Sequence, residues 1–181
     1  MRPMFTVHAG EFLVGQHIET NFKDTRVWLP SKDTGVDLLV TNARHSRGVT
    51  LQVKFSRDFL PIMKLAASTR QHLKACTWFS FDRSKIAQST ADLWVLVLLG
   101  FESKSRDYLV VKPKELLNRL DKLHGKTARH QVYVWITHDH RAWLARGLST
   151  AETRAVGQGT FGHRDRDVSR FLNNWSPIHR L

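Results

Sequence analysis

The sequence has little cysteine and no long apolar run. Cys76 is the only cysteine in 181 residues, so neither an intrachain disulfide nor a cysteine-based zinc site can form. The longest apolar run, residues 93–99, is far too short to cross a bilayer. Residues 1–10 lack the basic segment and apolar stretch of a secretory signal. We therefore expect a cytoplasmic protein.

Acidic residues are also scarce. Asp and Glu number 16 against 28 Lys and Arg, a formal net charge of +12. Positive side chains in such excess repel one another in a compact fold, so we expect an acidic partner that neutralises them. Nucleic acid is the commonest such partner and predicts strongly salt-dependent binding. A membrane surface, an acidic protein, or a basic protein that is merely kept soluble by its charge are the alternatives.

The organisation of the chain predicts one domain over residues 1–181, because no linker, repeat or low-complexity tract divides it. Helices are predicted over residues 10–22, 62–73, 113–124 and 167–175. Strands are predicted over residues 26–29, 36–41, 49–56, 77–81, 93–99, 107–111 and 131–137. A flexible stretch is expected near residues 157–166. This order predicts an α/β fold with a central mixed sheet covered by helices.

The hairpin of residues 36–56 combines polar chemistry with an apolar face. Side chains alternate along a strand, so Gln52 and Lys54 share one face while Leu51, Val53 and Phe55 share the other. On the preceding strand Asp37 lies opposite the face of residues 36, 38 and 40. One carboxylate, one amide and one amine therefore gather on one side. A solvated strand face with an Asp37–Lys54 ion pair is the plain alternative.

Phosphodiester hydrolysis would explain why a carboxylate, an amide and an amine gather on one face of the hairpin. It needs a hard divalent cation, an activated water and positive charge near the phosphate. Asp37 can bind Mg²⁺ or Mn²⁺, and the backbone carbonyl of Val53 can add a neutral oxygen. Lys54 can orient or deprotonate the water. Glu11 can complete the metal shell if its helix packs across the hairpin.

The segments GVDLLV and LQVKFS resemble the PD-(D/E)xK, or restriction-endonuclease-like, nuclease superfamily. They are most similar to the variant in which glutamine replaces the second acidic residue, found in some intron-homing endonucleases and small bacterial proteins. GEFLVGQHIE resembles the helix before the catalytic hairpin. The resemblance covers residues 9–137 as the core and leaves 138–181 as a C-terminal extension.

The resemblance implies a restriction-endonuclease-like core and a metal-dependent endonuclease that acts on DNA. Position by position, it implies that Asp37 is a metal ligand and that Gln52 occupies the second-acid position. Lys54 is then the lysine of the motif, and Glu11 is a helper. Val36 stands where the motif has proline. Gln52 is a weaker metal ligand than a carboxylate, so a non-catalytic nucleic-acid-binding module with a degenerate nuclease fold is the alternative, and an RNA-processing nuclease is a third.

Phosphate contacts come mainly from basic side chains. Arg44 and Arg47 in the hairpin turn, and Ser56 and Arg57 after the motif, are the candidates to bind the nucleic-acid backbone. Gln16 is a further candidate for the catalytic site. Cutting both strands with so small a domain would call for a homodimer.

Two other groups are weighed. His138, Asp139 and His140 suit zinc by type, but a third ligand at recognisable spacing is missing. Trp78, Trp94 and Trp135 lie within apolar strands and are interpreted as core residues, not as stacking platforms.

Overall fold

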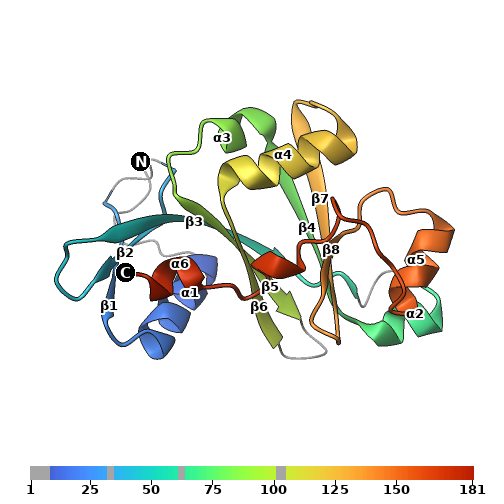
Figure 1. The fold of residues 1–181 in the computed structure, drawn as a ribbon, viewed down its shortest axis with the longest axis horizontal. Coiled ribbons are helices and arrows are strands. Elements are labelled where there is room, and N and C mark those ends of the chain that lie inside the picture. Colours follow the sequence, from blue (N-terminus) through green and yellow to red (C-terminus); the bar gives the residue numbers. More distant parts are fainter. Residues whose placement is uncertain (1–8, 32–34, 61–63, 101–104) are drawn as a thin grey trace.

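The computed structural model describes residues 9–31, 35–60, 64–100 and 105–181, and the side chains of Arg57 and Ser105 are outside this description (Figure 1). The strands are β1 Thr25–Trp28, β2 Leu38–Asn42, β3 Gly48–Arg57, β4 Leu73–Asp82, β5 Leu93–Gly100, β6 Ser105–Val111, β7 Arg129–Thr137 and β8 Ala142–Leu144. The helices are α1 Ala9–Asn21, α2 Ala67–His72, α3 Arg83–Ala87, α4 Pro113–His124, α5 Thr150–Gly157 and α6 Ser176–His179, with a 3₁₀ turn, η2, at Ser169–Phe171.

The strands form two sheets. A five-stranded sheet has the order β1-β2-β3-β5-β6, and a three-stranded sheet has the order β4-β7-β8. In the larger sheet β3 and β5 are parallel and the other neighbours are antiparallel. The smaller sheet is antiparallel throughout. The fold is thus α/β with a mixed central sheet flanked by helices, as the sequence predicts.

Strand β5 lies at the centre because nearly all its side chains are apolar and buried. Alternation sends them to opposite faces of the sheet. Trp94, Leu96 and Leu98 join a cluster with β4, β7 and α4, and this cluster fills the space between the two sheets. Val95 and Val97 join a second cluster that packs under α1. The predicted central strand covered on both faces is confirmed.

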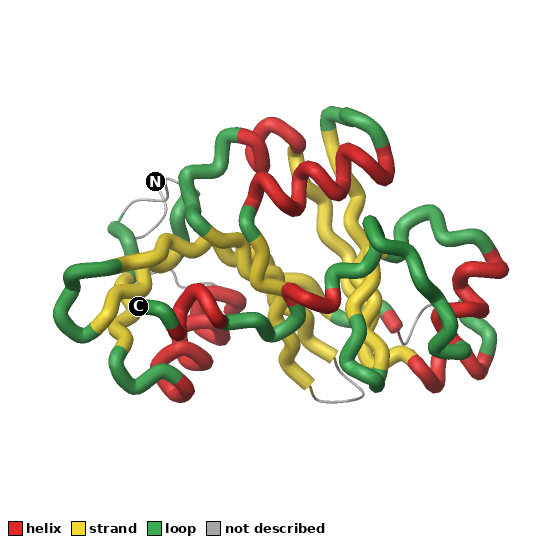
Figure 2. Tube along the Cα trace, viewed as in Figure 1, coloured by secondary structure: helices red, strands yellow, loops and turns green. Residues whose placement is uncertain are grey.

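Helix α1 covers the second face of the larger sheet. Its buried residues Val14 and Ile18 follow the fourfold spacing that predicts the helix, and they pack with Leu51 and Val53 of β3. Trp175 and Ile178, at the end of the chain, complete this cluster. Figure 2 shows α1 and α6 on the same side of the five-stranded sheet.

Residues 138–181 are part of the body of the fold, although the sequence suggests an extension. They supply β8 and helix α5, and their apolar side chains enter all three buried clusters. The stretch predicted to be flexible is anchored, because Phe161 packs on Trp143 with ring centroids 4.8 Å apart. Buried Arg166 also donates hydrogen bonds to the carbonyls of Leu144 and Arg146 at 2.8 and 2.7 Å.

Other differences concern short elements. Helix α2 is shorter than predicted, and residues 62 and 63 of the predicted range lie outside the described residues. In place of a helix over 167–175, the chain forms only the turn η2. Elements α3, β8, α5 and α6 have no counterpart in the sequence prediction. Among the described residues, no helix combines the length and apolar character needed to cross a membrane.

Candidate active site

The site begins where β2 leaves β3. Strand β2 starts at Leu38, which pairs with Leu51, whereas β3 continues to Arg57 and keeps only β5 as a neighbour along this stretch. The chain before Leu38 turns at Gly35, whose φ is 87°. As a result Val36 packs into the cluster between the sheets and Leu38 into the cluster under α1. The prediction that Val36 and Leu38 share a face is therefore wrong.

Asp37 sits at the branch between the two strands. Its N–H donates to the carbonyl of Leu51 at 2.8 Å, and its Oδ2 accepts the N–H of Val53 at 2.7 Å. No hydrogen bond reaches its Oδ1 from the described residues, and Asp37 forms no ion pair with any of them. The Asp37 carboxylate is thus held by the backbone of β3.

The backbone of Val53 adds an oxygen to the same place. In a strand the N–H and C=O of one residue point to the same edge. Since the Val53 N–H faces Asp37, its carbonyl faces that edge too, beyond the start of β2. A carboxylate oxygen and a carbonyl oxygen therefore lie at the branch point.

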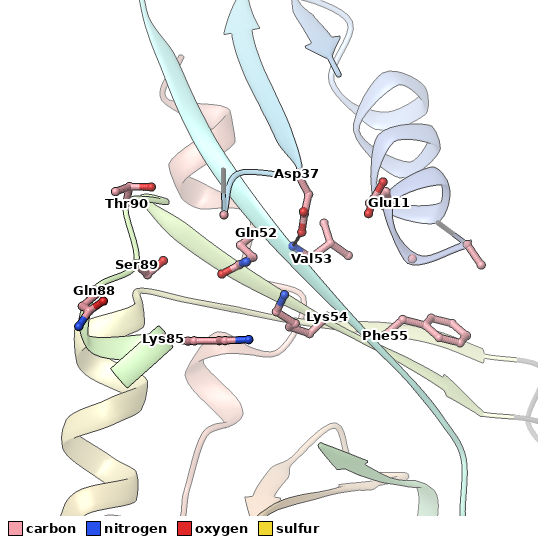
Figure 3. A pocket seen from close by; sticks show the side chains of 13 residues that line it. Glu11, Asp37, Gln52, Val53, Lys54, Phe55, Lys85, Gln88, Ser89 and Thr90 are labelled. Atoms are coloured by element: carbon pink, nitrogen blue, oxygen red, sulfur yellow. Dashed lines mark hydrogen bonds between the residues drawn. The ribbon is translucent and has the colours of Figure 1, made fainter. Parts of the chain in front are cut away.

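Gln52 and Lys54 project from the face of β3 opposite the buried Leu51 and Val53, as strand alternation predicts. Both are half-buried. The Lys54 Nζ lies 5.6 Å from the centroid of the Trp94 ring on neighbouring β5, a cation–π distance. The aromatic ring thus supports the lysine at the cleft. Figure 3 shows both side chains in the cleft below Asp37.

Glu11 reaches the cleft because α1 begins directly against β3. A Cβ added to Gly10 would meet the Phe55 Cβ at 2.9 Å and the Val53 Cγ1 at 3.2 Å, so only glycine allows this approach. The next residue, Glu11, lies in the wall of the cleft on the α1 side of Asp37 (Figure 3). The condition set for Glu11, that its helix packs against the hairpin, is therefore met.

The cleft has a volume of about 790 Å³. Its far wall was not predicted. It consists of α3 and the segment after it, and contributes Lys85, Gln88, Ser89 and Thr90. The short, mostly polar segment that forms α3 has no strong periodic signal, so the sequence offers little to place it near the hairpin.

Helix α3 is fixed to the fold by an ion-pair network. The Arg83 guanidinium donates to Asp121 of α4, with Nη2 2.7 Å from Oδ2. Fully buried His130 of β7 lies 3.1 Å from the other carboxylate oxygen. The hydrogen bond from Arg83 holds the pKa of Asp121 below its usual value. This network ties α3, α4 and β7 together behind the far wall.

The donors at the branch point suit a hard cation. They are the Asp37 Oδ1, the Glu11 carboxylate, the Val53 carbonyl and the side-chain oxygen of Gln52. Among the described residues, no three His, Cys, Asp or Glu side chains gather in one group. Mg²⁺ commonly keeps several waters and uses only one or two carboxylates together with substrate phosphates. The residues present fit that pattern and not a zinc cage.

Several predicted binding residues lie elsewhere. Ser56 is only 7% exposed, and its hydroxyl donates to the Trp78 carbonyl at 2.7 Å and accepts the Trp78 N–H. We correct its predicted phosphate contact to a structural link between β3 and β4. Arg57 ends β3, but its side chain is outside the described structure.

The hairpin arginines lie far from the cleft. Lys54 lies seven positions along the chain from Arg47, about 23 Å at roughly 3.3 Å per position of an extended strand. Arg47 donates to the carbonyl of Arg180 at 3.0 Å, so it ties the turn to the end of the chain. Arg44 is exposed in the same turn. Neither lines the cleft.

Gln16 also lies outside the cleft. It lines a separate hollow of about 530 Å³ between α1 and β6 and accepts a hydrogen bond from Arg106 at 3.3 Å. Asp139 accepts from Thr137 and lies 3.7 Å from His72. A zinc site with His138 and His140 is not assembled by the described residues.

One of the three strand tryptophans departs from the prediction that all are core residues. Trp94 and Trp135 are buried, as predicted. Trp78 is 40% exposed, so its prediction as a core residue is wrong. The helices α2 and α5 do not extend over its part of β4.

Comparison of the chain with protein-family models, with curated proteins and with solved structures finds no significant match. Inference about function therefore depends on the geometry of the cleft and on the resemblance of the hairpin motif.

Proposed function

We propose that the protein is a metal-dependent endonuclease that hydrolyses phosphodiester bonds in DNA on a restriction-endonuclease-like core. The observation that carries the proposal is the branch point of β2 and β3. There the Asp37 carboxylate is held by the Val53 N–H at 2.7 Å, and the Lys54 side chain lies beside it in a cleft of about 790 Å³. The helix that precedes the hairpin supplies Glu11, as the motif expects.

Each residue has a part in this chemistry. Asp37 and Glu11 would hold the cation, with the Val53 carbonyl as a neutral oxygen. A divalent cation, once bound, supplies Lewis-acid polarisation of a phosphoryl oxygen. Lys54 orients the attacking water and stabilises negative charge as it develops on the phosphate. The Asp37 hydrogen bond to the backbone keeps its carboxylate in place before substrate arrives.

Charge supports DNA as the substrate. The net charge of +12 favours a polyanion and predicts affinity that falls steeply with salt. Lys85 on the far wall adds a second amine to the cleft. A phosphodiester lying between Lys54 and Lys85 would meet positive charge from both sides.

The test is cleavage of plasmid, linear, branched and single-stranded DNA with Mg²⁺ or Mn²⁺. Lys54→Ala should reduce cleavage by about a hundredfold or more, as expected for a group that stabilises transition-state charge. Lys114→Ala is the matched control, since Lys114 is exposed on α4 away from the cleft. If the wild-type protein cuts none of these substrates with either metal, the proposal fails.

Asp37→Asn separates catalysis from folding. The amide oxygen can still accept the Val53 N–H, so the melting temperature should change little, whereas loss of charge should abolish cleavage. Asp24→Ala, at an exposed carboxylate outside the cleft, controls for net charge. Cleavage that survives Asp37→Asn would contradict the assignment of Asp37.

The second candidate is a binding module without activity. It is favoured by Gln52, which puts a neutral amide where a second carboxylate would strengthen metal binding. Calorimetric titration with Mn²⁺ distinguishes the two. The enzyme requires a Mn²⁺ site that the wild-type protein has and the Asp37→Asn variant lacks. A binding module needs no such site, and it should bind DNA equally well as wild type and as Asp37→Asn. Structured RNA in the substrate panel tests the RNA-processing alternative.

A further inference from the structure

One face of the three-stranded sheet carries exposed aromatic rings. Trp78 of β4 and Tyr133 of β7 are direct partners in the antiparallel register, so their side chains project from the same face. They are 40% and 38% exposed. Their neighbours Phe79 and Val132 point the other way and are buried between the sheets. The pair is therefore an open part of a sheet whose reverse side is core.

In the described part of the chain, this face is covered only on one side of the Trp78–Tyr133 pair. Cys76 and Trp135, the next pair on the same face of the sheet, are buried in the cluster that includes Leu60, Val156 and Phe161. Helices α2 and α5 pack together at this end (Figure 2). Beyond them, Trp78 and Tyr133 lie without a covering element in the described structure.

The aromatic surface continues to the candidate active site. The end of β3 joins β4 through the bridge between Asp58 and Thr77. The Phe59 ring lies 6.3 Å from the Trp78 ring. Phe55 lies four residues earlier, near the end of β3, and it lines the cleft with 40% exposure. Exposed rings thus lead from the cleft onto the small sheet.

The Trp78 ring is held in place. Its Nε1 donates to the Gln131 Oε1 at 2.8 Å, and the Gln131 amide in turn donates to the Ser80 hydroxyl at 3.2 Å. An exposed ring fixed in this way loses little conformational entropy when a flat partner stacks on it. It also places amide and hydroxyl groups beside the ring, where a base edge could reach them.

We infer that Phe55, Trp78 and Tyr133 stack the unpaired bases of a single-stranded segment of DNA whose backbone enters the cleft. This substrate assignment builds on the proposed nuclease function. Sequence-tolerant stacking on aromatic rings beside positive charge is how proteins bind single strands. The surface is aromatic and interleaved with Gln131 and Ser80, not aliphatic, and the chain carries a charge of +12. Bases in an intact duplex are stacked on one another and do not offer their faces.

The test measures binding in EDTA, so that no cleavage occurs. Fluorescence anisotropy compares a labelled single strand, the blunt duplex of the same sequence, and an abasic strand with the same phosphates. Trp78→Ala should weaken binding of the single strand about tenfold or more and leave the duplex and the abasic strand within about twofold. Trp28→Ala is the matched control. Trp28 is 49% exposed, donates its Nε1 to Thr41, and lies on β1, away from this surface.

Tyr133→Ala is a second variant that tests the stacking surface independently of Trp78. It removes the second ring without breaking the bond from Trp78 to Gln131, so it remains informative if Trp78→Ala fails to fold. If both alanine variants are folded, unchanged single-strand affinity in both of them overturns the inference. Trp78→Phe keeps an aromatic ring and should retain most of the affinity. If Trp78→Ala is unfolded, unchanged affinity in Tyr133→Ala alone overturns it.

Two further outcomes count against the inference. Equal weakening for all three nucleic acids would show that the rings do not recognise bases. Dissociation of a dimer on ring removal, seen by sedimentation, would show that a second copy covers them. Base-dependent binding by a protein that cuts nothing would leave the stacking surface standing while the nuclease proposal fails.

Discussion

Gly10 offers a sharp test of how α1 is seated on β3. Replacement by alanine puts a Cβ 2.9 Å from the Phe55 Cβ and 3.2 Å from the Val53 Cγ1. Carbon atoms do not approach so closely without movement, and overpacking of this kind costs about 1–3 kcal/mol. The higher helix propensity of alanine offsets about 1 kcal/mol at most. We expect a net loss of about 1–2 kcal/mol in the free energy of unfolding.

Gly15 on the same helix is the matched control. The nearest atom to an added Cβ there is the Val27 Cγ1 at 3.7 Å, an ordinary contact. Gly15→Ala should therefore stabilise the protein by about 0.5–1 kcal/mol through lower entropy of the unfolded chain. The same substitution at two positions of one helix is thus expected to change the free energy of unfolding in opposite directions.

Thermal unfolding followed by circular dichroism measures both variants. At about 2–4 °C per kcal/mol for a chain of this size, Gly10→Ala should lower the melting temperature by about 2–8 °C, and Gly15→Ala should raise it. The shift of α1 should also move Glu11 and reduce metal-dependent cleavage about tenfold to a hundredfold. A Gly10→Ala protein that melts at or above the wild-type temperature would refute this account of the α1–β3 contact.

Two further predictions concern links between elements. Ser56→Ala should cost about 1–2 kcal/mol in urea unfolding, because the Trp78 backbone loses both hydrogen bonds to that hydroxyl; an unchanged midpoint would contradict this structural role. Asp121→Asn should lower stability at neutral pH by about 2 kcal/mol by weakening the bonds to Arg83 and His130. Because the pKa of Asp121 is depressed, mainly by Arg83, its contribution is present above the unfolded pKa of about 3.9 and is lost as pH falls through the folded value. The gap in melting temperature between wild type and variant should narrow below about pH 4, and a gap independent of pH would argue against the linkage.

The long regular elements were predictable because their signals are local. Helix α1 shows fourfold apolar spacing, and β5 is an unbroken run of apolar residues. The proline that opens α4 is visible in the sequence as well. Each signal depends only on residues within one or two turns or within one strand, so no knowledge of the rest of the fold is needed.

The short elements and the second sheet were not predictable in the same way. Strand β8 has three residues and α3 has five, too few for a period to show. The sequence of β4 contains Trp78 between apolar neighbours, which suggested a core position. Whether that face is covered depends on where α2 and α5 dock on it. Helix α2 directly precedes β4, but α5 lies far along the chain, so local sequence does not reveal their packing.

For the candidate site, the sequence alone determined that Gln52 and Lys54 share a face opposite Leu51 and Val53. That follows from the alternation of side chains, a property of the extended backbone itself. Tertiary structure decided that β2 departs at Asp37, that α1 brings Glu11 over the hairpin, and that α3 closes the far wall. These depend on contacts between segments distant in the sequence, whose geometry is set by the volumes of the packed side chains and, at Gly10, by the lack of one.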